Sequence, residues 1–248
     1  MQKTNVYFFL AIKLITNLGG VAAILFLSAG TFSYPIGWLF VVLSIIIALV
    51  YVVVMLCKYP ALLKKRLIYK ENNFRQQIVI VTSLIISIMS LCSAGLSFRF
   101  NWICLPDERL VVSVALFVCA SYIYANLIRV NSFITSEITV QNEQEVIQSG
   151  PYRFVRHPMY SAMVLFMLAA AILLGSVLSI AVSILFFPVL ILRIQNEEQI
   201  LKKDLPGYIE YTQKVKYKLI PCESSWAYSG KQGGHWFFQC KHFSAQVI

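Results

Sequence analysis

The chain has 248 residues, of which 58% are hydrophobic and 13% are charged, and its mean hydropathy is +0.72. An ordinary soluble domain has about a quarter of its residues charged, so this composition excludes that class and indicates an integral membrane protein. The formal net charge of +10 would suit nucleic acid, but the basic residues gather in the connections between apolar runs. We therefore assign the charge to membrane topology and expect no nucleic-acid partner.

Apolar runs long enough to cross a membrane recur along the chain, since a hydrocarbon core of about 30 Å needs about 20 residues per helix. The first four are expected near residues 6–29, 34–57, 78–98 and 110–128. Two shorter runs follow near 159–174 and 177–193, and Gly175 and Ser176 separate them. They predict a tight helical hairpin whose second helix continues past the membrane surface. The predicted fold is an all-α, polytopic membrane helix bundle of about five to six transmembrane helices.

The basic residues predict which end of the bundle faces the cytoplasm, because Lys and Arg mark that side. Six of them crowd the connection between the second and third runs: Lys58, Lys64, Lys65, Arg66, Lys70 and Arg75. The connection around residues 30–33 carries no charge. Six crossings counted from there place both termini, the segment 149–160 and everything after residue 194 in the cytoplasm.

Residues 1–221 are predicted to form a single membrane domain, and residues 222–248 a flexible cytoplasmic tail. Between the fourth and fifth runs, residues 129–150 mix polar and apolar side chains, which suits a short interfacial helix or a strand-like loop. The six cysteines include no Cys-x-x-Cys pair, and the histidines of the tail lack the spacing of zinc ligands. No metal site is predicted.

The segment 149–160 is dense in ionisable and aromatic residues: Tyr152, Arg153, Arg156, His157 and Tyr160. Pro158 suits the first turn of a helix, which places the preceding histidine at the cap. Free N–H groups and the positive helix end then converge beside the two cations, an arrangement that suits an anionic or carboxylate-bearing ligand. The alternative is that these cations anchor the helix end to lipid phosphates while the tyrosines lie in the interfacial aromatic belt.

A second cluster closes the last apolar run. Arg193 and Glu197 lie four residues apart on one helical face, and Glu198 follows directly. Two adjacent carboxylates at a membrane edge are natural acceptors for ribose hydroxyls, although a solvated helix end with an ordinary salt bridge would look the same. Because the last two helices form a hairpin, their cytoplasmic ends must be neighbours. The two clusters are therefore predicted to share one site.

The following motifs carry a resemblance to a known family: Gly150-Pro151-Tyr152-Arg153-x-Val155-Arg156-His157-Pro158-x-Tyr160, Leu174-Gly175-Ser176, Arg193-x-x-x-Glu197-Glu198-x-x-Leu201, Leu205-Pro206-Gly207-Tyr208-x-x-Tyr211 and Leu219-Ile220-Pro221. In order and spacing they resemble the isoprenylcysteine carboxyl methyltransferase and phospholipid methyltransferase group. The segment 59–66 is similar to a Pro-x-Leu-Leu-x-x-Arg segment of bacterial members. Ala162, where the family usually has Gly, and the tail are departures from the pattern.

This resemblance implies an S-adenosylmethionine-dependent methyltransferase in the bacterial inner membrane, with the cofactor bound by residues 149–221 at the cytoplasmic ends of the last helices. The residues that it assigns to cofactor binding are Tyr152, Arg156, His157, Pro158, Tyr160, Glu197, Glu198, Tyr208 and Tyr211. The acceptor is expected to be a lipid-like or prenylated small molecule, and membrane lipids surround the protein.

For catalysis we expect roles for Arg153, Arg193 and Glu197. A carboxylate acceptor, as on a prenylated cysteine, would be steered by one of the two arginines, and carboxyl O-methylation is the favoured reaction. An amine acceptor, as on a phospholipid, would need a carboxylate to take its proton. Two other classes stay open: a scaffold or transporter subunit that retains the fold, and a reductase on a related scaffold. The sequence leaves the acceptor and the oligomeric state open.

Overall fold

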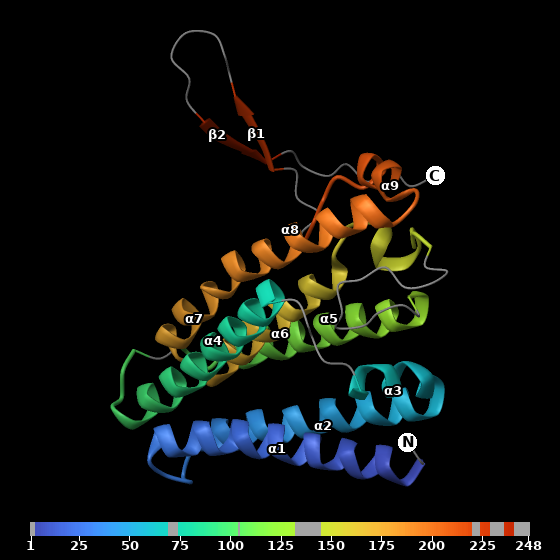
Figure 1. Ribbon diagram of the computed structural model, residues 1–248. Coiled ribbons are helices and arrows are strands. Elements are labelled where there is room, and N and C mark those ends of the chain that lie inside the picture. The colour runs from blue at the N-terminus through green and yellow to red at the C-terminus, as the bar shows by residue number, and fades with distance from the viewer. Residues whose placement is uncertain are drawn as a thin grey trace.

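The computed structural model is a bundle of long helices (Figure 1) and describes residues 3–68, 74–103, 105–131, 145–219, 224–228 and 236–240. The helices are α1 (Lys3–Ala29), α2 (Pro35–Lys58), α3 (Pro60–Ile68), α4 (Phe74–Arg99), α5 (Arg109–Val130), α6 (Pro158–Leu174), α7 (Val177–Ile184), α8 (Phe186–Asp204) and α9 (Tyr208–Lys214), with a 3₁₀ turn η1 (Gly150–Arg153) before α6. Strands β1 (Ser224–Tyr228) and β2 (Trp236–Cys240) follow.

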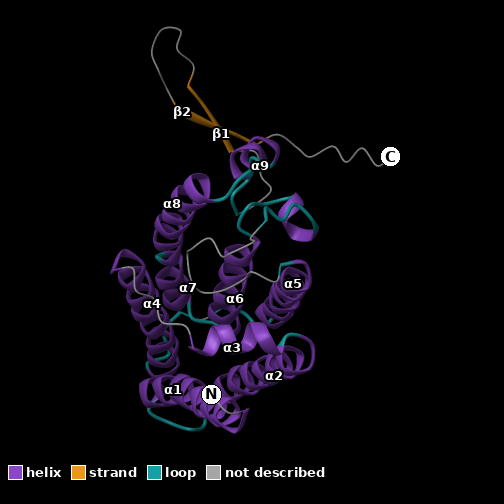
Figure 2. Cartoon of the chain, turned by 45° about the vertical axis from the view of Figure 1, so that its right-hand side comes forward, coloured by secondary structure: helices purple, strands orange, loops and turns teal. Residues whose placement is uncertain are grey.

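Within the described residues, five helical segments are long and apolar enough to cross a membrane: Tyr7–Ala29, Pro35–Lys58, Gln76–Arg99, Arg109–Val130 and Val177–Asp204. Helix α6 is shorter, with 17 residues, but at 1.5 Å per residue it spans about 25 Å, close to the thickness of the hydrocarbon core. Helix α6 lies in the middle of the bundle and contacts α2, α4, α5, α7 and α8 (Figure 2). The predicted all-α membrane bundle is confirmed.

The connections alternate between the two ends of the bundle. At one end, the Tyr34 hydroxyl donates to the carbonyl of Leu174 at 3.2 Å, and the amide of Leu105 donates to the carbonyl of Gly175 at 2.8 Å. The turns after α1, α4 and α6 therefore meet there. The start of α6 and the ends of α5 and α8 lie at the opposite end, as Figure 1 shows. That this second end faces the cytoplasm stays a prediction.

The hairpin of α6 and α7 turns where the sequence predicts it. Gly175 ends α6 with a positive φ of 75°, and Ser176 caps α7 by accepting a hydrogen bond from the Ser179 amide at 3.1 Å. A Cβ atom at position 175 would lie 2.6 Å from Nε of Arg109, so glycine suits this turn both in conformation and in size. The second helix is interrupted at Leu185 and then continues as α8 past residue 193 to Asp204.

Serine hydroxyls join α4 to the second half of the hairpin. The Ser90 hydroxyl lies 2.8 Å from that of Ser179 and 3.0 Å from that of Ser183, and the Ser97 hydroxyl lies 2.7 Å from that of Ser176. In a membrane, such hydrogen bonds fix the register of two helices because no water competes for them. The two helices run antiparallel, and α4 is thereby held at a fixed height relative to α8.

The described part of the tail consists of two strands. Strands β1 and β2 pair antiparallel, with Ser224 opposite Cys240, so the described part of the tail forms a hairpin, and the flexibility of the tail stays a prediction. The interfacial element predicted for residues 129–150 falls mostly outside the described residues. The same applies to His235 and His242 of the tail.

Candidate functional site

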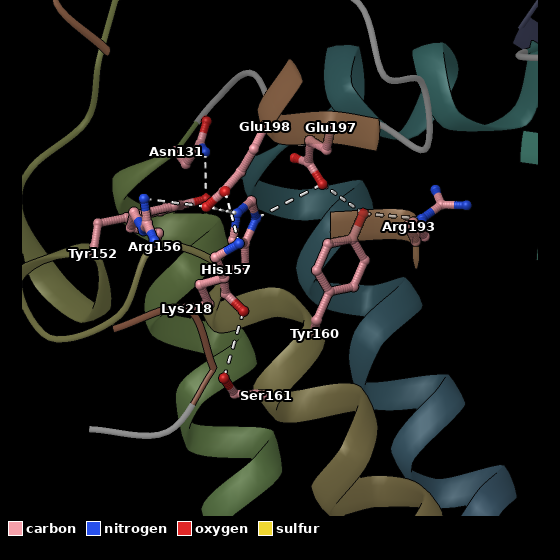
Figure 3. Close-up of polar contacts among 10 residues, drawn as sticks. All are labelled: Asn131, Tyr152, Arg156, His157, Tyr160, Ser161, Arg193, Glu197, Glu198 and Lys218. Carbon is pink, nitrogen blue, oxygen red and sulfur yellow. Dashed lines mark hydrogen bonds and ion pairs between the residues drawn. The ribbon is translucent and has the colours of Figure 1, made fainter. Parts of the chain in front are cut away.

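A cluster of charged and aromatic side chains lies where the start of α6 meets the last turns of α8 (Figure 3). Helix α6 begins at Pro158 with His157 as its N-cap residue. The backbone amides of Arg156 and His157 each donate, at 2.9 Å, to the carbonyls of Tyr217 and Lys218 respectively. Residues 216–219, which we name the strap, therefore run along the segment that leads into α6.

Glu198 is the centre of the first half of the cluster. Its side chain is only 6% exposed. One carboxylate oxygen lies 3.2 Å from Nη1 of Arg156 and 3.3 Å from Nε2 of His157, and the other lies 2.9 Å from Nζ of Lys218 in the strap. A buried carboxylate is tolerated only when it is paired and hydrogen-bonded, and Glu198 meets that condition. Its pairs join α6, α8 and the strap.

Glu197 forms the second half and is more open, with 24% of its side chain exposed. Its Oε2 accepts a hydrogen bond from the Tyr160 hydroxyl at 2.6 Å and lies 3.7 Å from Nδ1 of His157. Nε of Arg193 donates to the same tyrosine hydroxyl at 2.9 Å, and the guanidinium lies 5.8 Å from the ring centroid of that tyrosine. Tyr160 thus bridges Arg193 and Glu197. The second carboxylate oxygen of Glu197 makes no hydrogen bond to the described residues and is open to a ligand.

Three tyrosines from η1 and α9 border the cluster. The Tyr211 hydroxyl donates to the backbone carbonyl of Tyr152 at 2.8 Å, and the Asn131 amide donates to the Tyr152 hydroxyl at 2.6 Å. Burial raises the pKa of Tyr211 to about 12. Burial also raises the pKa values of Tyr152 and Tyr208, and the nearby glutamates raise that of Tyr208 further. All three phenols are therefore neutral near pH 7 and can donate hydrogen bonds.

Among the residues that the structure describes, two donors in this region are buried without a hydrogen-bond partner: Nε of Arg156 and the hydroxyl of Tyr208. An unsatisfied buried polar group costs about 1–3 kcal/mol, so such groups mark places where a ligand or water completes the structure. Together with the open oxygen of Glu197, the site offers two donors and one anionic acceptor. This set fits a ligand that carries both acceptor groups and hydroxyl or ammonium donors.

The structure brings most of the predicted residues into one network: Arg156, His157, Tyr160, Arg193, Glu197 and Glu198, with Tyr152, Tyr208 and Tyr211 beside them. Pro158 is buried at the start of α6. Arg153 differs, because it is exposed on η1, and none of its described contacts reaches the network.

Sequence reasoning missed two participants, Asn131 and Lys218. Asn131 directly follows α5 and holds Tyr152, and nothing in its surroundings in the sequence sets it apart from other loop residues. Lys218 directly precedes the Leu219-Ile220-Pro221 motif. That position was a signal that the strap returns to the site.

Comparison with known proteins agrees with this geometry. Residues 109–206 match the family model of phospholipid methyltransferase, a stretch that runs from the start of α5 to just past the end of α8. It contains the segment 149–160 and both glutamates of the cluster. No curated protein matches the chain. This part of the chain is therefore similar to the phospholipid methyltransferase domain, in agreement with the motifs of residues 149–201.

Proposed function

We propose that this membrane methyltransferase takes the methyl group from S-adenosylmethionine, bound at the cluster of Glu197 and Glu198, and transfers it to a carboxylate on a lipid-like acceptor. The observation that carries the proposal is the donor and acceptor set of the cluster. S-adenosylmethionine has a carboxylate that fits the unpaired Arg156 Nε and Tyr208 hydroxyl. It also has ribose hydroxyls and an ammonium group, which fit the open oxygen of Glu197.

When bound, S-adenosylmethionine supplies a methyl group on a sulfonium, which is already a good leaving group. The work of the protein is therefore to position the reactants, and alignment alone is worth up to about 7–11 kcal/mol of the barrier. Glu197 is held in place by the Tyr160 hydroxyl, which Arg193 fixes from the other side. Glu198, tied to Arg156, His157 and Lys218, keeps the strap closed against the start of α6.

Arg193 is the better placed of the two arginines to receive an anionic acceptor. It lies at the edge of the network next to Tyr160, at the level where α8 leaves the apolar part of the bundle. Arg153 is exposed on η1 and would act earlier, by attracting the acceptor to the surface of the site. Glu197 binds the cofactor in this scheme and takes no proton from a carboxylate acceptor.

An apolar cavity below the site supports a lipid-like acceptor. It has a volume of about 380 Å³ and is lined by side chains from α2, α4, α5, α6 and α8. The four lining residues of α6 are Met163, Phe166, Met167 and Ala170. They follow Tyr160 by 3 to 10 residues, which places the cavity about 4.5–15 Å deeper along the helix axis. An apolar chain in the cavity would hold a polar end group near the cluster.

A phospholipid amine is the second candidate acceptor. The matched family is described as phospholipid methyltransferase, and the partly open Glu197 is the group that would take the proton of an amine. The product distinguishes the two reactions, because a methyl ester releases methanol in base and a methylated amine keeps its label.

The central experiment measures binding of S-adenosylhomocysteine to the purified full-length protein in detergent, and then transfer of radiolabelled methyl. The acceptors are an N-acetyl-S-farnesylcysteine, an isoprenoid acid and phosphatidylethanolamine. We expect binding, and base-labile label on the two acids. Base-stable label on the phospholipid would favour the amine reaction. Absence of S-adenosylhomocysteine binding would favour a scaffold or a reductase and overturn the proposal.

Filling the cavity is expected to weaken acceptor use alone. Ala170→Phe adds a ring where the apolar chain would lie. If the usual overpacking cost of about 1–3 kcal/mol is lost from acceptor binding, KM for a farnesylated acceptor rises by about 5- to 150-fold. S-adenosylhomocysteine binding should not change. Leu192→Phe, at a position exposed on the lipid-facing side of α8, is the matched control. Equal KM values for the two variants would place the acceptor chain elsewhere.

A further inference from the structure

Gln76, in the first turn of α4, is a buried amide that the proposed mechanism does not use. The residue is 1% exposed, and neither Nε2 nor Oε1 of its side chain has a hydrogen-bond partner within the described part of the chain. It lies outside residues 109–206, which match the family model. A carboxamide that lacks partners for both atoms is costly to bury, so a ligand that supplies an acceptor and a donor would stabilise it.

The serine contacts place Gln76 at the height of Glu197. Helices α4 and α7 run antiparallel, with Ser97 next to Ser176 and Ser90 next to Ser183. Gln76 precedes Ser90 by 14 residues, and Glu197 follows Ser183 by 14 residues. Since helical residues rise at about the same rate, the two side chains lie at the same level of the bundle.

The helical period also gives the direction in which Gln76 points. Ser87 and Ser90 of α4 line the apolar cavity, and they follow Gln76 by 11 and 14 residues, close to three and four turns at 3.6 residues per turn. Gln76 therefore lies on the same face of α4 as the cavity, nearer the site. On this side, Ile86 of α4 packs in one cluster with Tyr160 of α6 and Ile194 of α8. The face of Gln76 is thus directed to the space between the cavity and the site.

We propose that the Gln76 carboxamide binds the polar head group of the methyl acceptor and selects a head group in which a carboxylate stands beside an N–H. Nε2 donates to the carboxylate and Oε1 accepts from the N–H, so both atoms gain a partner at once. The class of acceptor is a lipidated amino acid or peptide end, with its chain in the cavity below. This inference rests on the proposed function and specifies its acceptor.

The test compares Gln76→Leu with the wild-type protein on two farnesylated acids that differ in one group. One is N-acetyl-S-farnesylcysteine, and the other is the matched thioether acid without the acetamido group. Leucine keeps the approximate volume of glutamine and removes both polar atoms, so the variant is expected to fold. Ser83→Ala is the control, because Ser83 is seven residues further along the same face and its hydroxyl bonds to the Val79 carbonyl of its own helix.

We expect kcat/KM of Gln76→Leu to fall about tenfold or more on the N-acetyl acid and clearly less on the acid without the N–H, since loss of a matched polar partner penalises the ligand that used it. The rise in unfolding temperature caused by the N-acetyl acid should also shrink, while S-adenosylhomocysteine affinity stays constant. Equal losses on both acids, or none, would overturn the assignment of Gln76 and leave the methyltransferase proposal intact. Failure of the wild-type protein to methylate either acid would overturn both.

Discussion

Glu197→Gln is expected to weaken binding of S-adenosylhomocysteine by about 10- to 100-fold, because a hydrogen bond to a charged group is worth about 1.5–3 kcal/mol. The substitution retains the size of the side chain and an oxygen that can accept from the Tyr160 hydroxyl. It removes only the negative charge that the proposed ligand would meet. The affinity is measured by isothermal titration calorimetry on the detergent-purified protein.

The matched control for this prediction is Glu210→Gln, since Glu210 is an exposed carboxylate on α9 near the same end of the bundle. It should bind S-adenosylhomocysteine as the wild-type protein does. His157→Ala should weaken binding as well, because His157 lies between the two glutamates. Unchanged affinity in Glu197→Gln would mean that the open carboxylate does not face the ligand, and the proposed binding mode would be wrong.

Glu198→Ala is expected to have the largest effect on stability, about 3–5 kcal/mol, because removal of one partner of a buried pair leaves the other charge uncompensated. In Glu198→Ala the uncompensated charge is that of Arg156, whose side chain is only 9% exposed. Lys218→Ala should cost at most about 1 kcal/mol, because the Lys218 side chain is 44% exposed and screened by water. Chemical unfolding followed by intrinsic fluorescence compares the two variants.

Loss of Glu198 should also release the strap. In the wild-type protein, the strap is held by the Glu198–Lys218 pair and by the two backbone hydrogen bonds from Arg156 and His157. The Arg156 guanidinium and the Ser161 hydroxyl also donate to the carbonyls of Lys216 and Leu219. Trypsin should therefore cleave after Lys216 and Lys218 faster in Glu198→Ala than in the wild-type protein. Equal cleavage rates would show that the hydrogen bonds from Arg156, His157 and Ser161 are sufficient to hold the strap and that Glu198 has a smaller structural role.

Several features of the fold followed from local sequence. Pro158 predicted the start of α6, Gly175 and Ser176 predicted the turn of the hairpin, and the apolar runs predicted the spans. These features depend on backbone conformation or on contact with lipid, and both act within a few residues of the chain. The continuation of the last helix past the membrane surface was also predicted, but its end at Asp204 was not, because the apolar run ends near residue 193 and the polar residues that follow still form helix.

The division of roles between neighbouring residues depended on the tertiary structure. Glu197 and Glu198 look alike in the sequence, but successive residues on a helix point about 100° apart. Glu197 therefore meets Tyr160, while Glu198 meets Arg156 and the strap. Arg153 and Arg156 also look alike in the sequence but differ in their surroundings. Arg153 is exposed on η1, whereas the side chain of Arg156 reaches Glu198.

The sequence by itself determined that the chain crosses a membrane, where its helices begin and turn, and which polar residues stand at the membrane edge. Each of these depends on hydropathy and backbone preference along a continuous segment. Only the tertiary structure decided that Asn131 and Lys218 join the site and that Gln76 lies level with Glu197. These residues come from segments far apart in the chain, and the packing of α4, α6 and α8 sets the distances between them.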